Sequence, residues 1–248
     1  MSIVLFKYLN SEPFRFLAKS LSLKIIDTVP RDLLTVVDDE NPDIVLAPVT
    51  YIQELESRDY KLSNIVIASK GPVKSVCVLA EDRRINNFDI IYATRESVVS
   101  VKVLEHILKI RNVRPKIVHI NVTLENIKEV VKRGPLLAIG DIALIARKFY
   151  RPILDLAQEW YKLYSKPLVF AVVMYRSRDH VSRIIRAFYT MLSSKKFLRN
   201  VAKLTSHWIV KYLRRDEIFQ YFVGNLMYVL DNASKYVTFQ FSRLLSNF

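Results

Sequence analysis

The chain has 248 residues, of which 51% are apolar and 25% are charged, and this composition excludes a disordered chain while allowing one large domain or two smaller ones. Its formal net charge is +14, and its single cysteine, Cys77, excludes an internal disulfide framework and a multi-cysteine metal site. Lys7 interrupts the first apolar run and no run approaches the ~20 residues of a membrane span, so we predict a soluble, cytoplasmic protein without a secretory signal.

The first 175 residues alternate between strand-like and helix-like patterns. Short apolar, β-branched runs predict ten strands, at residues 3–7, 23–27, 43–47, 64–68, 75–79, 90–93, 116–120, 136–139, 153–155 and 168–175. Helix-like segments lie between many of them, and the clearest is 97–113, where apolar residues recur at three- and four-residue spacing. Strands that alternate with helices predict a parallel, doubly wound sheet.

After Tyr175 the pattern becomes helical, with no strand signal and few helix breakers. This tail, residues 176–248, holds 13 Lys and Arg against 4 Asp and Glu, which is about +9 of the total charge. Such a balance is typical of a solvated helical surface, and it also attracts small anions, acidic partners or nucleic acid. We do not expect nucleic acid, because no basic run interleaved with aromatic residues lies on a predicted loop.

Known catalytic signatures are absent from the sequence. It contains no dinucleotide-binding or phosphate-binding glycine loop, no zinc-protease motif and no serine-hydrolase elbow. The four histidines lack the spacing of metal ligands, so we expect neither a metal nor a cofactor. Cys77 falls inside a predicted strand, which favours a buried, inert thiol.

Polar residues recur instead where predicted strands end. They are Asn10, Ser11, Thr50, Ser69, Lys74, Ser75, Ser97, Ser100, Gly140 and Asp141. In an open α/β sheet, ligands bind outside the carboxyl ends of the strands, and the free N–H groups at helix starts attract carboxylates. Each Ser, Thr or Asp is equally open to a structural role as a helix N-cap. Together they predict an anion-binding cleft without identifying its ligand.

Six segments, in order, resemble one family. The stretch YLNSEPF resembles the YLNTxPL signature of the menaquinone-biosynthesis family that includes chorismate dehydratase, and the segment VPRDLLTVVDDENPDIVLAPVTYIQEL follows it. The stretches SKGPVKSVCVL, ESVVSVKVL, AIGDIAL and LAQEWYKLYSKPLVFAVVMY are similar to the family's remaining motifs, and together they cover about residues 1–175. Two positions depart from the pattern: Ser11 and Val99 stand where the family has Thr. The tail is less specifically similar.

The resemblance implies an α/β, two-lobed fold like that of type II periplasmic binding proteins, with a helical C-terminal tail. Lobe one would comprise residues 1–80 and 176–248, and lobe two residues 81–175. The chain would cross between the lobes near 75–80 and 168–175, and the ligand would lie between them.

The implied function is removal of water from chorismate, a small dianion, to give 3-[(1-carboxyvinyl)oxy]benzoate. Asn10 and Ser75 would be catalytic, and Ser11, Thr50, Ser69, Lys74, Ser97, Ser100, Gly140 and Asp141 would bind the substrate. The substrate's own enolpyruvyl carboxylate is one candidate proton acceptor, and Glu12, Lys74 and Asp141 compete with it. A non-catalytic cytoplasmic protein that binds small anions is the alternative, because fold alone does not fix function.

Overall fold

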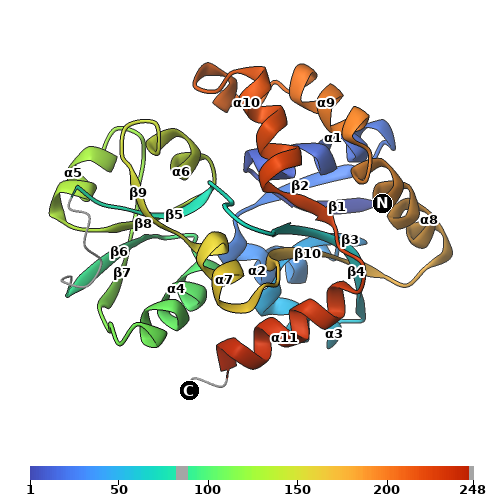
Figure 1. The fold of residues 1–248 in the computed structure, drawn as a ribbon. Helices are drawn as coiled ribbons and strands as arrows, with labels where there is room; N and C mark the ends of the chain where they lie inside the picture. Colours follow the sequence, from blue (N-terminus) through green and yellow to red (C-terminus); the bar gives the residue numbers. More distant parts are fainter. Residues whose placement is uncertain (82–88, 246–248) are drawn as a thin grey trace. The chain divides into compact units, whose positions relative to one another are not determined.

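The computed structural model describes residues 1–81 and 89–245, and its contacts divide the chain into two units (Figure 1). The first unit joins Met1–Ala68 to Val169–Gln240, and the second joins Ser69–Leu168 to the residues from Phe241 onward. Each unit has its own β-sheet. Within the described residues, no helix is both long enough and apolar enough to cross a membrane.

The first unit is built on a six-stranded sheet in the order β11-β4-β10-β3-β1-β2. Its strands are β1 (Ser2–Phe6), β2 (Lys24–Thr28), β3 (Ile44–Pro48), β4 (Tyr60–Ser69), β10 (Leu168–Arg176) and β11 (Met227–Val229). Strand β1 pairs in parallel with β2 and β3, whereas β10 runs antiparallel to β3 and β11 antiparallel to β4. The parallel core is nearly all apolar, since Ile3, Val4 and Leu5 of β1 are fully buried.

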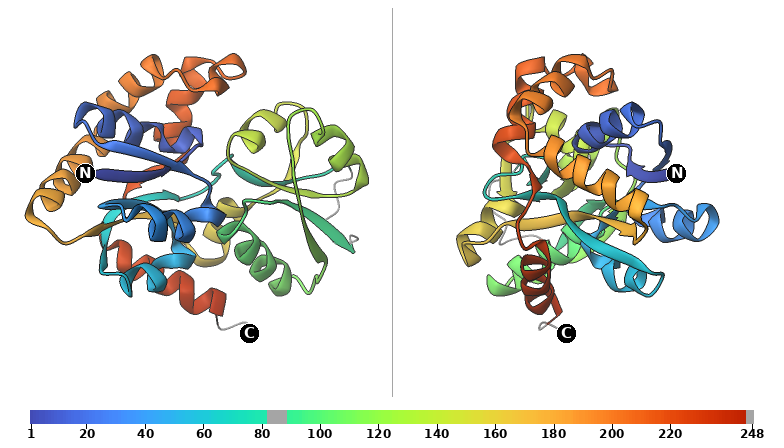
Figure 2. Two further views of the ribbon diagram at one scale, coloured as in Figure 1. Left: turned by 180° about the vertical axis from the view of Figure 1, so that it is seen from behind. Right: turned by 90° about the vertical axis from the view of Figure 1, so that its right-hand side faces the viewer.

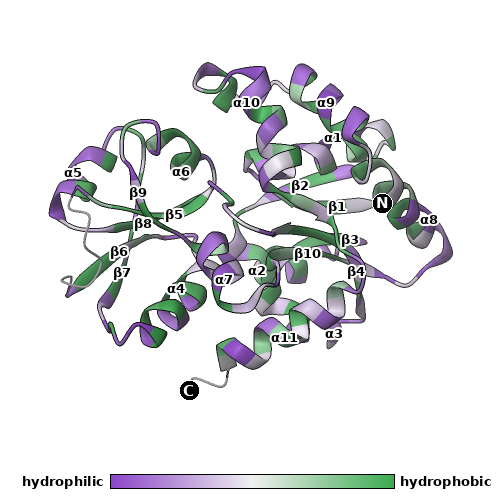
Figure 3. Cartoon of the chain, viewed as in Figure 1, coloured by the Kyte–Doolittle hydropathy of each residue, from purple (hydrophilic) through white to green (hydrophobic). Residues whose placement is uncertain are grey.

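Helices cover this sheet with their apolar sides. They are α1 (Glu12–Ser20), α2 (Leu33–Glu40), α3 (Ile52–Glu56), α8 (Asp179–Leu192), α9 (Lys195–Leu204), α10 (Arg215–Gln220) and α11 (Ala233–Leu245). Helix α8 buries Val181, Ile185, Phe188 and Leu192, at the spacing that places residues on one helix face. Figure 3 shows the consequence, with hydrophobic strands inside and helices of mixed polarity around them. In the views of Figure 2, α8 and α9 lie beside α1.

The second unit has a five-stranded sheet in the order β7-β6-β8-β5-β9. Its elements are β5 (Val76–Leu79), β6 (Ile90–Thr94), α4 (Val99–Ile110), β7 (Lys116–Ile120), α5 (Ile127–Arg133), β8 (Leu136–Ile139), α6 (Gly140–Ala146), β9 (Pro152–Asp155) and α7 (Leu156–Tyr164). Strand β6 pairs in parallel with β7 and β8, and β5 runs antiparallel to both β8 and β9.

All ten strands predicted from the sequence are present, but the prediction of a parallel sheet is confirmed only in part. Strands β5 and β10 reverse direction in their sheets, and both sheets are therefore mixed. The prediction of a tail without strands is also wrong, because β11 pairs with β4. Three residues are too short to produce an alternating pattern, and the hydrogen-bonding partner of β11 lies far away in the sequence.

The unit boundaries differ from those expected from the sequence. The contacts divide the chain after Ala68 and Leu168, whereas the expected lobes divided after residues 80 and 175. The reason is that β5 and β10 are paired strands of the second and the first sheet respectively, and not isolated crossings. A hinge near these segments stays a prediction.

Cys77 lies on β5, and its burial is confirmed because the side chain has no exposed surface. Burial raises the pKa of its thiol to about 12. The thiol is therefore protonated at neutral pH and is a poor nucleophile.

A glutamine side chain supports the first unit where the chain enters β10. The amide of Gln240, on α11, is almost fully buried. Its Oε1 accepts a hydrogen bond from the Val169 N–H at 2.9 Å, and its Nε2 donates to the Val169 carbonyl at 2.8 Å. One side chain thus satisfies both backbone groups of a buried residue, beside two of the points where the chain passes between units.

We expect Gln240→Leu to lower the free energy of unfolding by about 2–5 kcal/mol, because it leaves two buried backbone groups without partners. Chemical denaturation monitored by circular dichroism measures this loss. Gln220→Leu, on an exposed position of α10, is the control and should change stability by less than about 0.5 kcal/mol. Equal stability of the two variants would contradict the assigned role of Gln240.

Candidate functional site

In the second unit, several predicted site residues gather at one edge of the sheet. The parallel strands β6 and β8 end at this edge, and the antiparallel strand β5 begins there, since Val76 is level with Ile139. Ser75 immediately precedes β5, and its carbonyl accepts a hydrogen bond of 2.7 Å from the Gly140 N–H. Gly140 has a φ of +61°, a left-handed conformation that favours glycine. The register therefore brings the 75 and 140 segments together.

A buried carboxylate shapes the loop that leads to Ser75. Asp155, at the end of β9, accepts hydrogen bonds from the N–H groups of Val73 at 3.0 Å and Lys74 at 2.8 Å. It also caps α7 by accepting from Gln158 N–H at 3.2 Å. Burial raises the pKa of Asp155, and these N–H groups oppose that rise. Asp155 thus holds Lys74, whose φ is +66°, in a left-handed conformation.

Two hydroxyl groups at this edge are buried and have no hydrogen-bond partner. Thr94 ends β6 and Ser97 lies in the following turn; each side chain is 3% exposed, and neither hydroxyl is paired. The turn is closed by a bond of 3.0 Å from Ser97 N–H to the Thr94 carbonyl. Unpaired buried polar groups are rare in native proteins, and they occur at sites that bind a ligand, an ion or water. Thr94 and Ser97 are therefore candidate hydrogen-bond donors for an anion here.

Helix α4 begins next to these hydroxyls. Ser100, in its first turn, is buried, and so is Val99, the residue that departs from the family pattern. Of the apolar face predicted for this helix, Leu104, Ile107 and Leu108 are buried. The apolar Val99 side chain thus occupies the position of the missing hydroxyl, and Ser97 and Ser100 stand on either side of it in the sequence.

In the first unit, the corresponding edge is formed by the ends of the parallel strands β1 and β3. Asn10 lies half-buried in the 3-10 helix Leu9–Ser11, and its Oδ1 accepts a bond of 3.3 Å from the Ser11 hydroxyl. Thr50 lies in the 3-10 helix Val49–Tyr51, and its hydroxyl is buried without a partner. The same local design, a strand followed by a short turn and a helix, positions both residues.

The capping role considered for these residues is contradicted at three positions. Ser11 is the N-cap residue of α1, yet its side chain makes no capping hydrogen bond. Ser97 does not cap α4, whose N-cap residue is Val98. Asp141 lies in the first turn of α6, and Ile139 precedes that helix as its N-cap residue. The side chains of Ser11 and Ser97 thus do not cap helices.

The structure gathers the predicted residues in two sets, one in each unit. The set in the second unit comprises Ser69, Lys74, Ser75, Ser97, Ser100, Gly140 and Asp141, and the set in the first comprises Asn10, Ser11 and Thr50. Ser69 is tied to its own loop, because its hydroxyl donates to the Gly71 carbonyl at 3.0 Å. The binding and catalytic roles of all ten residues stay predictions.

Sequence reasoning missed Thr94 and Asp155. Thr94 is the residue that directly follows the predicted strand 90–93, and Asp155 is the last residue of the strand 153–155. The expectation that site residues lie where strands end applies to both Thr94 and Asp155. Neither was chosen, because the unpaired Thr94 hydroxyl and the N–H partners of Asp155 become visible only in three dimensions.

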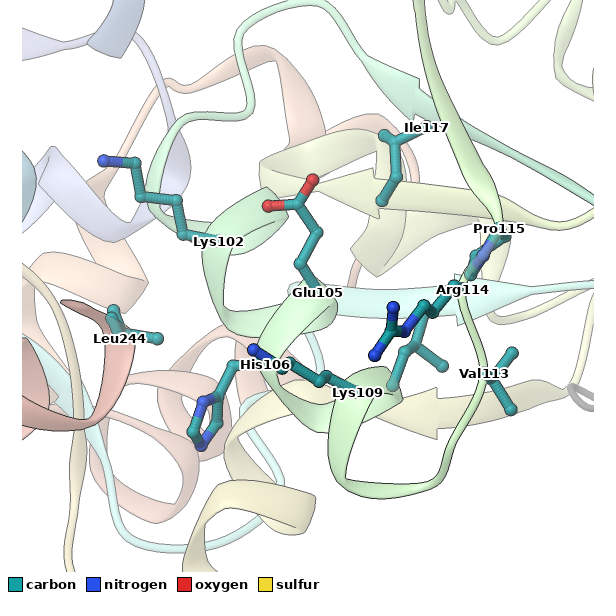
Figure 4. A pocket seen from close by; sticks show the side chains of 10 residues that line it. Lys102, Glu105, His106, Lys109, Val113, Arg114, Pro115, Ile117 and Leu244 are labelled. Atoms are coloured by element: carbon teal, nitrogen blue, oxygen red, sulfur yellow. The ribbon is translucent and has the colours of Figure 1, made fainter. Parts of the chain in front are cut away.

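A hollow of about 340 Å³ in the second unit is lined by none of these residues (Figure 4). It is lined by α4, the loop before β7, β7 itself and Leu244 of α11; the residues are Lys102, Glu105, His106, Leu108, Lys109, Val113, Arg114, Pro115, Ile117 and Leu244. Lys109 lies in the last turn of α4, where positive charge offsets the helix dipole, whereas Lys102 lies near the start of that helix and Arg114 follows it. We assign this hollow no ligand. Within residues 1–81 and 89–245, no group of three His, Cys, Asp or Glu side chains could hold a metal ion.

Comparison with solved structures defines the class of fold. The chain is 14% identical to protein AF1704 from Archaeoglobus fulgidus, with 99% of this chain and 95% of that chain covered and a TM-score of 0.67. It is 13% identical to an ABC transporter protein from Parabacteroides distasonis, with coverage of 100% and 92% and a TM-score of 0.70. It is 12% identical to the periplasmic aliphatic sulphonate binding protein from Escherichia coli, with coverage of 99% and 85% and a TM-score of 0.62. The expected periplasmic-binding-protein-like fold is confirmed.

A family model described as menaquinone biosynthesis matches residues 1–244. The chain therefore belongs to the menaquinone-biosynthesis family, as its motifs indicated. None of the curated proteins compared with the chain matches it significantly.

We expect Asp155→Asn to lower the free energy of unfolding by about 1–3 kcal/mol, because an amide nitrogen would face one of the N–H donors. The difference between the wild type and Asp155→Asn should also depend on pH. The folded pKa of Asp155 lies above the unfolded value, so the folded state binds more protons and this group's contribution decreases as the pH rises through the folded pKa. Denaturation at several pH values measures this trend; a difference that grows with pH would contradict it.

We expect Ser97→Ala and Thr94→Val to leave the free energy of unfolding unchanged or to raise it by about 1 kcal/mol, because each removes an unpaired buried hydroxyl. Ser63→Ala is the matched control. The buried Ser63 hydroxyl donates to the Val173 carbonyl at 2.7 Å and accepts from Ile65 N–H at 3.1 Å. Its loss should cost about 1–3 kcal/mol. If Ser97→Ala destabilised the protein as much as Ser63→Ala, the Ser97 hydroxyl would have a structural role.

Proposed function

We propose that the protein is a chorismate dehydratase, a hydro-lyase that converts chorismate to 3-[(1-carboxyvinyl)oxy]benzoate and water in menaquinone biosynthesis by the futalosine route. The unpaired hydroxyls of Thr94 and Ser97 carry the proposal, taken together with the family membership. Hydroxyls that are buried without partners suit a ligand that supplies hydrogen-bond acceptors, and chorismate brings two carboxylates.

The reaction needs positioning more than a strong acid or base. A ring C–H next to the enol ether loses its proton, the neighbouring hydroxyl leaves as water, and the ring becomes aromatic. Because aromatisation supplies a large driving force, the protein's task is to fix the substrate's pose, polarise it and exclude water. In the proposal the enolpyruvyl carboxylate of the substrate accepts the ring proton, and the released proton and hydroxyl form the water.

Four residues have a role in this scheme: Asn10, Ser75, Thr94 and Ser97. The Ser97 and Thr94 hydroxyls donate hydrogen bonds to a substrate carboxylate. Ser75, which immediately precedes β5, is a catalytic residue in this proposal. The amide of Asn10 can donate and accept at once, which suits a step that moves a proton and a hydroxyl between neighbouring carbons. Glu12 is a poor general base, because its carboxylate accepts a hydrogen bond from Thr205 and pairs with Arg15.

The alternative is a protein on the same fold that binds small anions without chemistry. The fold is shared with the sulphonate-binding protein from Escherichia coli, and fold alone does not fix function. Incubation of the purified protein with chorismate separates the two functions. New aromatic absorbance, with a product lighter than chorismate by one water, is expected of the enzyme. Saturable binding of unaltered chorismate would support the binding protein instead.

We expect Asn10→Ala to lower the turnover number about 10²–10³-fold, the usual effect of losing a hydrogen bond made in the transition state. Thermal stability should change little, since Asn10 is only half-buried. Asn200→Ala, on an exposed position of α9, is the control and should retain full turnover. An Asn10→Ala protein that melted early but kept its activity per folded molecule would assign this residue to folding.

A further inference from the structure

Segment 6–12, which joins β1 to α1 and contains Asn10, is held by a loop that follows α9. The Thr205 hydroxyl donates to Glu12 Oε2 at 2.6 Å, across 193 positions of sequence. Thr205 has no exposed surface, and Glu12 is 5% exposed. His207 Nε2 donates to the carbonyl of Lys7 at 3.1 Å. Two residues of one distant loop thus hold the segment on both sides of Asn10.

Arg15 closes the network from α1. Its Nε pairs with Glu12 Oε1 at 3.1 Å, and its Nη2 donates to the Phe6 carbonyl at 3.4 Å and to Asp27. Both oxygens of the Glu12 carboxylate therefore have a donor. The carbonyls of Phe6 and Lys7, the last groups before the turn, are fixed by Arg15 and His207.

Thr205 is itself rigidly placed. Its N–H donates to the Val201 carbonyl at 2.8 Å, and its carbonyl accepts from Arg215, which also reaches the Ala202 carbonyl at 3.3 Å. Its hydroxyl oxygen accepts from His207 N–H at 3.1 Å. Because several hydrogen bonds fix Thr205, its bond to Glu12 also fixes the position of the first residue of α1.

The orientation of Asn10 depends on this backbone. Its Oδ1 accepts a long bond of 3.3 Å from Ser11, which lies on the same segment and so adds no outside support. We propose that Thr205 and His207 are positioning residues for Asn10, which they act on through Glu12 and the Lys7 carbonyl. The expected loss of turnover rests on the proposed role of Asn10, whereas the expected loosening of segment 6–12 does not.

The bond between Thr205 and Glu12 is the part that a substitution tests most cleanly. A hydroxyl that donates to a carboxylate makes a stronger bond than one between neutral groups. Thr205→Val keeps the shape of the side chain and removes that donor, and Thr205→Ser keeps the donor. A substitution outside the site that moves a reacting group by ~1 Å can lower the rate about 10²-fold.

We expect Thr205→Val to lower the turnover number about 10–100-fold with KM changed by less than about threefold, and Thr205→Ser to restore turnover to within about threefold of the wild type. Hydrogen exchange of the peptide spanning residues 7–12 should be about tenfold faster in Thr205→Val, and close to wild type in Thr205→Ser. Unchanged exchange in Thr205→Val would overturn the proposal.

Two controls separate positioning from general stability. Thr190→Val makes the same chemical change on an exposed side chain, whose hydroxyl donates within its own helix α8, and it should alter neither readout. Val181→Ala creates a cavity under α8 and should lower the melting temperature by several degrees without selectively speeding exchange at residues 7–12. A matching loss of turnover in Val181→Ala and Thr205→Val, at equal melting temperature, would overturn the positioning role.

The exchange experiment also distinguishes this inference from the proposed function. If the protein does not dehydrate chorismate, faster exchange at residues 7–12 in Thr205→Val still supports the attachment of this segment, and the failure lies with the proposed function. If the wild type is active and Thr205→Val loses no turnover despite faster exchange, the segment is attached but Asn10 does not depend on it, and the positioning role is overturned.

Discussion

The need to satisfy buried backbone groups governs how this protein holds its loops. Asp155 shows the principle most clearly, because one buried carboxylate accepts three backbone N–H groups and so fixes the loop before Ser75 together with the start of α7. Gln240 does the same for both backbone groups of Val169. In each case a polar side chain is buried because backbone groups far away in sequence need a partner.

The hydroxyls of Thr50, Thr94 and Ser97 are among the buried side-chain groups without a hydrogen-bond partner, and these three lie where strands end. Burial without a partner lowers stability, so these positions are costly to a protein that only has to fold. A ligand with acceptor groups removes that cost on binding. Ser63 is a contrasting case within the same chain, because its buried hydroxyl is paired with the Val173 carbonyl.

The basic tail has structural roles as well as charge. Arg215 binds the carbonyls that α9 leaves free, and through Thr205 it belongs to the network that reaches Glu12. Arg178 pairs with Asp43, next to the sheet of the first unit. Other cations, such as Lys196 and Lys203, are exposed. The excess positive charge therefore combines particular contacts with a solvated surface, and its long-range part is screened by salt.

The ten strands, the burial of Cys77 and the strand-end position of the candidate residues could be predicted from the sequence, because periodicity and composition over a few neighbouring residues display them directly. The family could be predicted as well, from the resemblance of six motifs in order. The sequence did not determine the reversal of β5 and β10 or the pairing of β11, because strand direction depends on partners far along the chain. Two further features are visible only in three dimensions: Ser11 does not cap α1, and Glu12 accepts a hydrogen bond from Thr205. A hydrogen bond across 193 positions leaves no local pattern in the sequence.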